Sequence, residues 1–214
     1  MILSTSSINL RDSHVMAIVN VTPDSFYSGS RTLQHEDIVR RVESVIKDGA
    51  TIIDIGGYSS RPGAVDVSLE QEWERVDLGV GVARGIAPHV AISVDTFRAE
   101  IVRRTVEKYG KIVVNDITAG EADDEMVDVV AQLDLPYVAM HMRGTPQTMQ
   151  SQTDYPNGVV SEVCDYFAKR VELLKSRGVE NIILDPGFGF AKTLEQNYVY
   201  SRCEPRRYSY LRIP

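Results

Sequence analysis

Three hydrogen-bonding side chains stand directly after short apolar runs of the sequence. They are Asp95, Asn115 and Asp185. A carboxylate accepts two donors side by side, while an amide offers one donor and one acceptor, so the set suits recognition of a flat heterocycle. Asp95 could in addition stabilise positive charge that develops on a bound ring. The structural alternative is that the three side chains only orient neighbouring loops.

The segment after Asp185 is built to hold an aromatic residue next to the carboxylate. It reads Pro186, Gly187, Phe188, Gly189 and Phe190. Proline fixes its own φ and glycine adopts positive φ freely, so this path is a rigid turn. A charge at the end of a buried strand is costly unless something binds it. The pattern therefore indicates a ligand at this turn.

A second polar segment, Gly56–Gly63, combines glycines with the guanidinium of Arg61. Arginine binds phosphate or carboxylate through a planar fork, so with Asn20 nearby this loop predicts an anion site. Mg²⁺ takes few protein oxygens and prefers substrate phosphates, which makes Asn20 the candidate metal ligand. His141 has no partner in the sequence pattern and is interpreted as structural. No arrangement typical of nucleophilic or zinc chemistry is present.

Six apolar runs must position these residues. Their continuous apolarity, without alternation, is typical of strands buried on both faces of a parallel sheet. The runs are Val15–Val21, Ile52–Ile55, Ala91–Val94, Ile112–Val114, Tyr137–Met140 and Ile182–Leu184.

Helical patterns fill the segments between the runs. One amphipathic stripe starts at a capping box formed by Ser68 and Gln71, and two others end at Gly110 and Gly178. Strand and helix in alternation predict an α/β fold, either an open doubly wound sheet or a closed barrel. We favour the barrel, because every strand ends in polar residues and no GxGxxG opens the first helix.

In a parallel sheet the carboxyl ends of all strands meet at one face, where we expect the polar residues to gather. For Thr22, Asp24 and Asp116, taken singly, a role as helix cap or loop residue is at least as good an interpretation. The expected set is Asn20, Thr22, Asp24, Ser60, Arg61, Asp95, Asn115, Asp116, His141, Arg143 and Asp185.

Composition places the chain among ordinary soluble proteins. Its 214 residues are 43% apolar and 25% charged, enough for one core. The net charge of −7 argues against a general nucleic-acid binder. No apolar run is long enough for a membrane helix, and the N-terminus lacks the features of a secretory signal. Cys164 and Cys203 form no metal-binding or redox motif, so we expect a cytoplasmic protein with reduced thiols.

Six motifs occur in one order, and together they are highly specific. They are Asn-Val-Thr-Pro-Asp-Ser-Phe (20–26), Gly-Gly-Tyr-Ser-Ser-Arg-Pro-Gly-Ala (56–64), Ser-Val-Asp-Thr (93–96), Asn-Asp-Ile (115–117), His-Met-Arg-Gly-Thr-Pro (141–146) and Asp-Pro-Gly-Phe-Gly-Phe-Ala-Lys-Thr (185–193). From about Val15 to Tyr198 the chain resembles bacterial dihydropteroate synthase.

The resemblance implies a TIM barrel, a transferase of folate biosynthesis and a target of sulfonamides. The family joins dihydropterin pyrophosphate to p-aminobenzoate and releases diphosphate, with Mg²⁺ as the metal. The implied mechanism is SN1-like, with a pterin cation that the arylamine attacks. Members are usually homodimers, and nothing in the pattern suggests nucleic-acid or membrane partners.

The resemblance also implies roles for individual residues. Asp95 and Arg61 would be catalytic, stabilising the cation and the departing charge, and Asn20 would bind the metal. The pterin pocket would comprise Asp95, Asn115, Asp185, Met140 and Ile117. The p-aminobenzoate and diphosphate subsites would comprise Thr22, Ser60, Arg61, Pro62 and Phe190.

The chain departs from the family pattern at three places. Tyr58 stands where many members have glutamate, and Ser60 where many have threonine. After Tyr198 the sequence leaves the family pattern, as a C-terminal truncation or frameshift would produce. We therefore expect an incomplete barrel domain of about six βα units at residues 1–198, an atypical tail at 199–214, and very low activity or none.

Two alternatives remain open at this point. The first is a non-catalytic fragment that binds pterin weakly or not at all. The second is a methyltetrahydrofolate-binding methyltransferase, which would share the Asp/Asn set but lack the Ser-Ser-Arg-Pro loop that this chain has at 59–62.

Overall fold

A computed structural model of the chain describes residues 13–22, 31–59 and 66–202. Its strands are β1 (Met16–Asn20), β2 (Ile52–Gly56), β3 (Ala91–Asp95), β4 (Val113–Asp116), β5 (Tyr137–Met140) and β6 (Ile182–Asp185). Its α-helices are α1 (Arg31–Lys47), α2 (Leu69–Ile86), α3 (Ala99–Tyr109), α4 (Met126–Gln132), α5 (Val159–Ser176) and α6 (Leu194–Ser201). A short 3₁₀ helix, η1 (Met149–Ser151), precedes α5.

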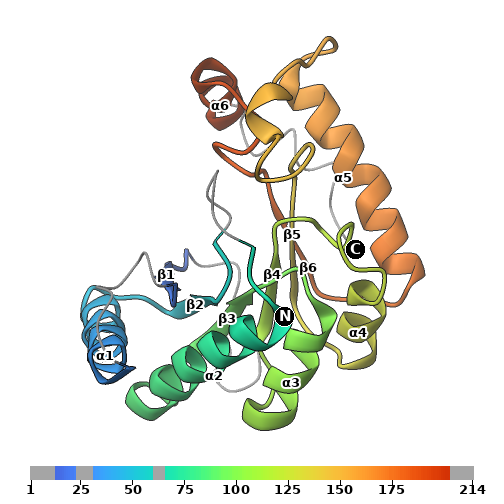
Figure 1. Ribbon diagram of the computed structural model, residues 1–214. Coiled ribbons are helices and arrows are strands. Elements are labelled where there is room, and N and C mark those ends of the chain that lie inside the picture. Colours follow the sequence, from blue (N-terminus) through green and yellow to red (C-terminus); the bar gives the residue numbers. More distant parts are fainter. Residues whose placement is uncertain (1–12, 23–30, 60–65, 203–214) are drawn as a thin grey trace.

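The six strands form one parallel sheet whose spatial order is the order of the chain, β1 to β6. A doubly wound sheet reverses its strand order at a switch point, and the described strands do not. Helices α1 to α5 follow one another around the outside of the strands (Figure 1). This is the winding of a (β/α) barrel, so the prediction of a barrel is confirmed and the doubly wound alternative is wrong.

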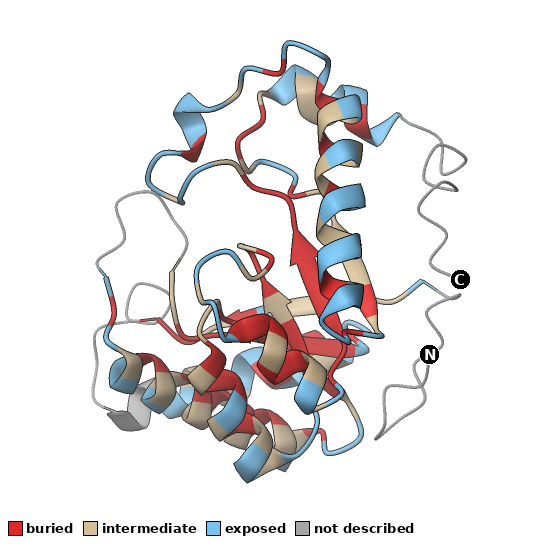
Figure 2. Cartoon of the chain, turned by 90° about the vertical axis from the view of Figure 1, so that its right-hand side faces the viewer, coloured by how far each residue is buried: buried red, intermediate tan, exposed pale blue. Residues whose placement is uncertain are grey.

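Both faces of the sheet are buried along β2 to β5, as the continuous apolar runs predict. Residues such as Ile53, Ile92 and Val114 point outward and pack under the helices in the main core. The inner face carries a smaller cluster of Ile52, Ala91, Val113 and Val138. Figure 2 shows the inner strands buried, while the helices expose their outer sides. The edge strands β1 and β6 are only partly buried, and Ile18 of β1 is 57% exposed. Each strand therefore presents alternate residues to the helices and to the barrel interior.

Local signals hold the helix ends. Ser68 and Gln71 form the predicted capping box, and Gly110 ends α3 with φ of +79°. A second capping box, between Thr193 and Gln196, starts α6 and was not predicted. Helix α6 continues to Ser201, past the expected domain boundary at residue 198, and residues 203–214 lie outside the described part of the chain.

Within the described residues, every helix is too short or too polar to cross a bilayer.

Candidate active site

Three polar residues and one glycine line up across four neighbouring strands at the carboxyl end of the sheet. The strand register pairs Asn20 with Gly56, Gly56 with Asp95, and Asp95 with Asn115. Paired residues of parallel strands point to the same face, which here is the barrel interior. Asp185 ends β6 in register with Met140 at the same end of the sheet. The structure therefore brings the predicted residues Asn20, Asp95, Asn115 and Asp185 to one face.

Gly56 leaves an opening in this row. A Cβ atom at Gly56 would lie 2.8 Å from Asn20 Oδ1 and 3.5 Å from Asp95 Oδ2. The two side chains therefore flank a space that any larger residue at position 56 would fill. Because both atoms are oxygens, the space is suited to a cation or to a hydrogen-bond donor.

Asp95 stands in a strongly acidic environment. Burial raises its pKa well above the usual range, and the charges of Asp54, Asp116 and Glu72 raise it further. By surface area Asp95 is only half-buried, since it lies at the strand end. No positive charge of the described residues contributes to the pKa of Asp95, so a ligand that brings positive charge or hydrogen-bond donors would favour its ionised form.

Asp54 lies one level deeper in the barrel and was not predicted as a site residue. It is 3% exposed, and its Oδ2 accepts a hydrogen bond of 3.0 Å from Asn115 Nδ2. Burial raises the pKa of Asp54, and its neighbours Ser93 and Asn115 offset part of the rise. Among the described residues, Asp54 Oδ1 and Ser93 Oγ lack a partner with hydrogen-bond geometry, so the bond to Asn115 is the better defined contact.

The turn after β6 holds Asp185 in place. Gly187 N donates to Asp185 Oδ1 at 2.8 Å, which fixes the carboxylate against its own turn. Gly187 has φ of +65°, and a Cβ atom there would lie 2.2 Å from the carbonyl oxygen of His141. Only glycine fits this close approach of the turn to the end of β5.

A buried pair, Lys192 and His141, lies beneath the same turn. Lys192 Nζ lies 3.0 Å from His141 Nδ1 and donates to the carbonyl oxygens of Gly187 and Phe190, each at 3.0 Å. A lysine ammonium has no acceptor, so Nδ1 of a neutral His141 accepts from it. Burial and the charges of Lys192 and Arg143 lower the pKa of His141 to about 4, and burial lowers that of Lys192 to about 8. His141 is therefore structural, as interpreted from the sequence.

The apolar residues expected around the pterin pack together. Ile117, Met140, Met142, Met149 and Ala191 form one buried cluster, and the half-buried ring of Phe190 packs against it. A cavity of about 360 Å³ adjoins the cluster at Ile117 and Met142 and is bounded on its other side by the rings of Tyr58 and Phe97.

Asp116 is on the opposite face of β4 and is occupied by its own loop. Its carboxylate accepts hydrogen bonds from Thr118 N and Gly120 N, each at 2.8 Å, from Thr118 Oγ1 at 2.7 Å and from Tyr137 Oη at 2.7 Å. Asp116 therefore stabilises its own loop, which is the structural interpretation given for it from the sequence.

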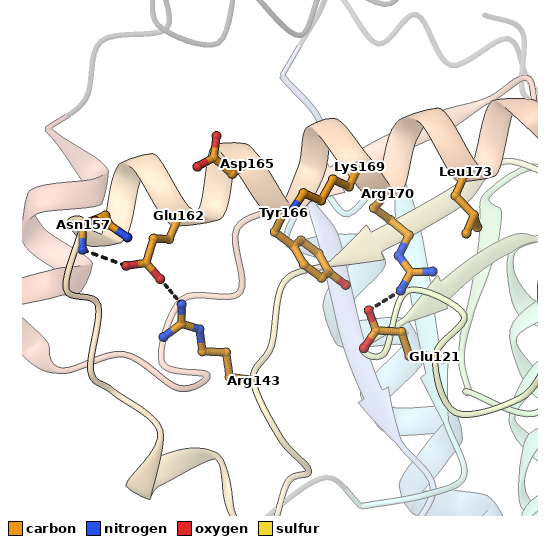
Figure 3. A pocket seen from close by; sticks show the side chains of 9 residues that line it. All are labelled: Glu121, Arg143, Asn157, Glu162, Asp165, Tyr166, Lys169, Arg170 and Leu173. Atoms are coloured by element: carbon orange, nitrogen blue, oxygen red, sulfur yellow. Dashed lines mark hydrogen bonds and ion pairs between the residues drawn. The ribbon is translucent and has the colours of Figure 1, made fainter.

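Arg143 likewise has its partners outside the row formed by Asn20, Gly56, Asp95 and Asn115. It pairs with Glu162 on α5, donates to the Asp154 carbonyl, and lies 3.9 Å above the ring of Tyr155. Figure 3 shows Arg143 and Glu162 in a cleft of about 490 Å³ along α5, where Glu121 pairs with Arg170. This cleft is larger than the cavity at Ile117, but most of its charges already neutralise one another.

The remaining predicted residues are only partly within the described segments. Thr22 is buried next to β1, where Val21 N donates to the Gly56 carbonyl at 2.8 Å. Asp24, Ser60, Arg61 and Pro62 lie outside the described residues. No group of three or more His, Cys, Asp or Glu side chains suited to a metal occurs in the described segments.

Asp54 could have been found from the sequence by strand parity. It is the one charged residue in the run Ile52–Ile55, and it shares its face with Gly56. Lys192 gave no such signal, since its partners come from the ends of β5 and β6.

Comparison with known proteins agrees with this geometry. The "Pterin binding enzyme" family matches residues 16–202. The chain is 44% identical to the folic acid synthesis protein fol1 of Schizosaccharomyces pombe over 184 residues, 85% of this chain and 25% of that protein. It is 42% identical to the dihydropteroate synthase of Escherichia coli K12 over 197 residues, 90% of this chain and 68% of that enzyme.

Solved structures give the same result. The dihydropteroate synthase of Xanthomonas albilineans with 4-aminobenzoic acid matches with a TM-score of 0.82 and 34% identity, over 93% of this chain and 70% of that one. The same enzyme in complex with 7,8-dihydropteroate matches with a TM-score of 0.78 and 31% identity, over the same shares of the two chains. The chain thus spans a quarter of the fungal protein and about two thirds of the bacterial enzymes. It belongs to the pterin binding enzyme family, among the dihydropteroate synthases.

Proposed function

We propose that this chain binds a pterin at the carboxyl end of its sheet and acts as a dihydropteroate synthase. The reaction joins dihydropterin pyrophosphate to p-aminobenzoate and yields dihydropteroate and diphosphate. The observation that carries the proposal is the set of hydrogen-bond acceptors formed by Asp95, Asn115 and Asp185 on one face of the sheet, beside the cluster that contains Ile117 and Met140. An amino-pyrimidine edge is rich in donors and its ring is flat, so it complements such a site.

Asp95 is the residue that acts on the reacting ring. Loss of diphosphate breaks a carbon–oxygen bond and leaves positive charge on the pterin, which the Asp95 carboxylate stabilises. Nitrogen of the arylamine then forms the new carbon–nitrogen bond and releases one proton to solvent. No general base is needed within the described residues, which is consistent with a neutral His141 whose Nδ1 already accepts from Lys192.

The diphosphate and the arylamine occupy the adjoining part of the face. Asn20 fits a role as Mg²⁺ ligand, because its Oδ1 borders the open space over Gly56 and faces the carboxylate of Asp95. Bound Mg²⁺ would offset the charge of the departing diphosphate. Arg61 would share that role, and Thr22, Ser60, Pro62 and Phe190 would border p-aminobenzoate. The Xanthomonas albilineans enzyme has been solved with 4-aminobenzoic acid and with 7,8-dihydropteroate, which supports these compounds as ligands by analogy.

The direct test is an assay for dihydropteroate. The purified chain is incubated with dihydropterin pyrophosphate, p-aminobenzoate and MgCl₂, and the product is separated by chromatography. We expect product above the protein-free background, reduced by about 10²–10³ in the Asp95→Asn variant. Asp124→Asn, at an exposed carboxylate, is the charge-matched control.

A wild-type rate equal to the protein-free background would contradict catalysis and favour the non-catalytic alternative. Run beside the Escherichia coli synthase, the same assay tests the expectation that this chain turns over slowly. A rate comparable with that of the complete enzyme would contradict that expectation.

A further inference from the structure

Asp54 is a buried carboxylate that the proposed reaction does not use. It contacts the side-chain amide of Asn115, which we propose binds the pterin. Asp54 is 3% exposed and accepts from Asn115 Nδ2 at 3.0 Å. The two residues are on β2 and β4, and β3 lies between them in the sheet. The bond therefore reaches across the barrel interior under Asp95 and does not belong to the backbone ladder.

The bond determines which way the amide of Asn115 faces. Asn115 Nδ2 donates to Asp54 Oδ2, so the amide nitrogen points toward Asp54 and the amide oxygen points away from it. One N–H is then committed to Asp54, while Oδ1 and the second N–H remain for a ligand. A rotation of the amide by 180° would bring its oxygen against the carboxylate, which is unfavourable in a buried site.

We propose that Asp54 is a positioning residue that fixes the order of acceptor and donor that Asn115 presents to the pterin. The inference rests on the proposed function, because it assumes a pterin beside Asn115. With this order fixed, Asn115 should bind best to a ring edge on which an N–H donor is next to an unprotonated ring nitrogen. The amino group and N1 of a pterin have this order. In a lumazine, a carbonyl and an N1–H reverse it.

The alternative is that Asp54 only contributes to folding. A structural role would change the melting temperature of a variant and leave its ligand preference as it is. The ratio of two dissociation constants, for 6-hydroxymethylpterin and 6-hydroxymethyllumazine, therefore separates the two roles.

The experiment is calorimetric titration of the full chain with both ligands. We expect the wild type to prefer the pterin, and Asp54→Asn to reduce that preference about tenfold or more, because an amide at position 54 accepts either orientation of Asn115. Asp54→Leu should reduce the preference for the pterin at least as far. If the leucine variant does not fold, the result for Asp54→Asn still decides the test. Thr105→Ala is the control: it removes a buried hydroxyl of α3 that donates to the Ile101 carbonyl, and it should leave the preference unchanged.

Two results would count against the inference, and they differ. If the wild type binds the pterin and a folded Asp54→Asn keeps the full preference, Asp54 does not position Asn115 and the proposed function stands. If the wild type binds neither ligand, the proposed function fails and this inference fails with it.

Discussion

Asp95 and Asp116 are carboxylates at the ends of neighbouring strands, and they face opposite sides of the sheet. Asp95 is in register with Asn115, so both point into the barrel, while Asp116 follows Asn115 and points outward. Asp116 is enclosed by donors from its own loop and from Tyr137. Asp95 instead has other carboxylates for neighbours, which raise its pKa together with burial. Strand parity, more than residue type, decides which acid is available to a ligand.

His141 should make stability depend on pH. Its pKa is about 4 in the folded protein against an ordinary value of 6.5, so the unfolded chain binds a proton first as pH falls. The stabilisation is complete above pH 6.5 and is lost as pH falls toward 4, by up to about 3 kcal/mol. We expect His141→Gln, whose amide oxygen can still accept from Lys192, to flatten this part of the curve.

The measurement is urea unfolding of both proteins between pH 4 and pH 7. His89→Gln, at an exposed histidine, is the control and should follow the wild-type curve. If the difference in unfolding free energy between wild type and His141→Gln is the same at all pH values, the histidine does not have the environment described.

Among the elements, the turn from β6 to α6 depends most on a few contacts. Lys192 links His141, at the end of β5, to two carbonyl oxygens of the turn. The carboxylate of Asp185 accepts a hydrogen bond from Gly187 N in the same turn. Together these bonds hold the Asp185 carboxylate on a backbone path that only glycine permits at position 187.

Gly187→Ala should therefore damage both stability and the site. The new Cβ atom would lie 2.2 Å from the His141 carbonyl, in addition to the strain of positive φ. We expect a loss of about 2–4 kcal/mol in unfolding free energy and weaker pterin binding.

The matched control for that substitution is Gly189→Ala. Gly189 has φ of +81° but no atom within 4 Å of its Cβ position, so it tests backbone strain alone. We expect a loss of about 1 kcal/mol there. Equal losses in the two variants would show that the close approach at Gly187 is unimportant.

Helix α2 is tied to the segment between β3 and α3 by the buried carboxylate of Glu72. Glu72 is fully buried, accepts from Thr96 Oγ1 at 2.6 Å, and pairs with Arg98 at 2.7 Å. Glu72→Ala would remove the acceptor of the buried Thr96 hydroxyl and the carboxylate partner of Arg98, which would keep its bond to the Val67 carbonyl. We expect the unfolding free energy to fall by about 3 kcal/mol, measured by urea unfolding.

Glu74→Ala, at an exposed position of the same helix, should change it by less than about 0.5 kcal/mol. A Glu72→Ala variant as stable as Glu74→Ala would mean that the pair contributes nothing to the fold.

At the scale of the whole molecule, the sequence pattern predicted the order and type of the elements well. Each apolar run is a strand within one or two residues of its predicted ends, because parallel strands buried on both faces need continuous apolar residues. The strand-end rule likewise placed Asn20, Asp95, Asn115 and Asp185 at one face.

The sequence pattern could not predict side-chain contacts between residues that are far apart in the chain. The bond from Asp54 to Asn115 spans 61 positions, and that from Lys192 to His141 spans 51. Strand parity with Gly56 can identify Asp54 from the sequence, but it does not identify its partner, and Lys192 is an ordinary loop lysine with no local signature. Their importance comes from where the strand register brings them.

The most direct test of the central claim is the affinity of the chain for a pterin. Titration calorimetry with 6-hydroxymethylpterin should give one site per chain in the wild type. The affinity should fall by about tenfold or more in Asp185→Asn, which keeps the bond to Gly187 but loses the charge that faces the ligand. Asp124→Asn should bind as the wild type does. Absence of binding in the wild type, or equal affinity in Asp185→Asn, would contradict a pterin site at this face of the sheet.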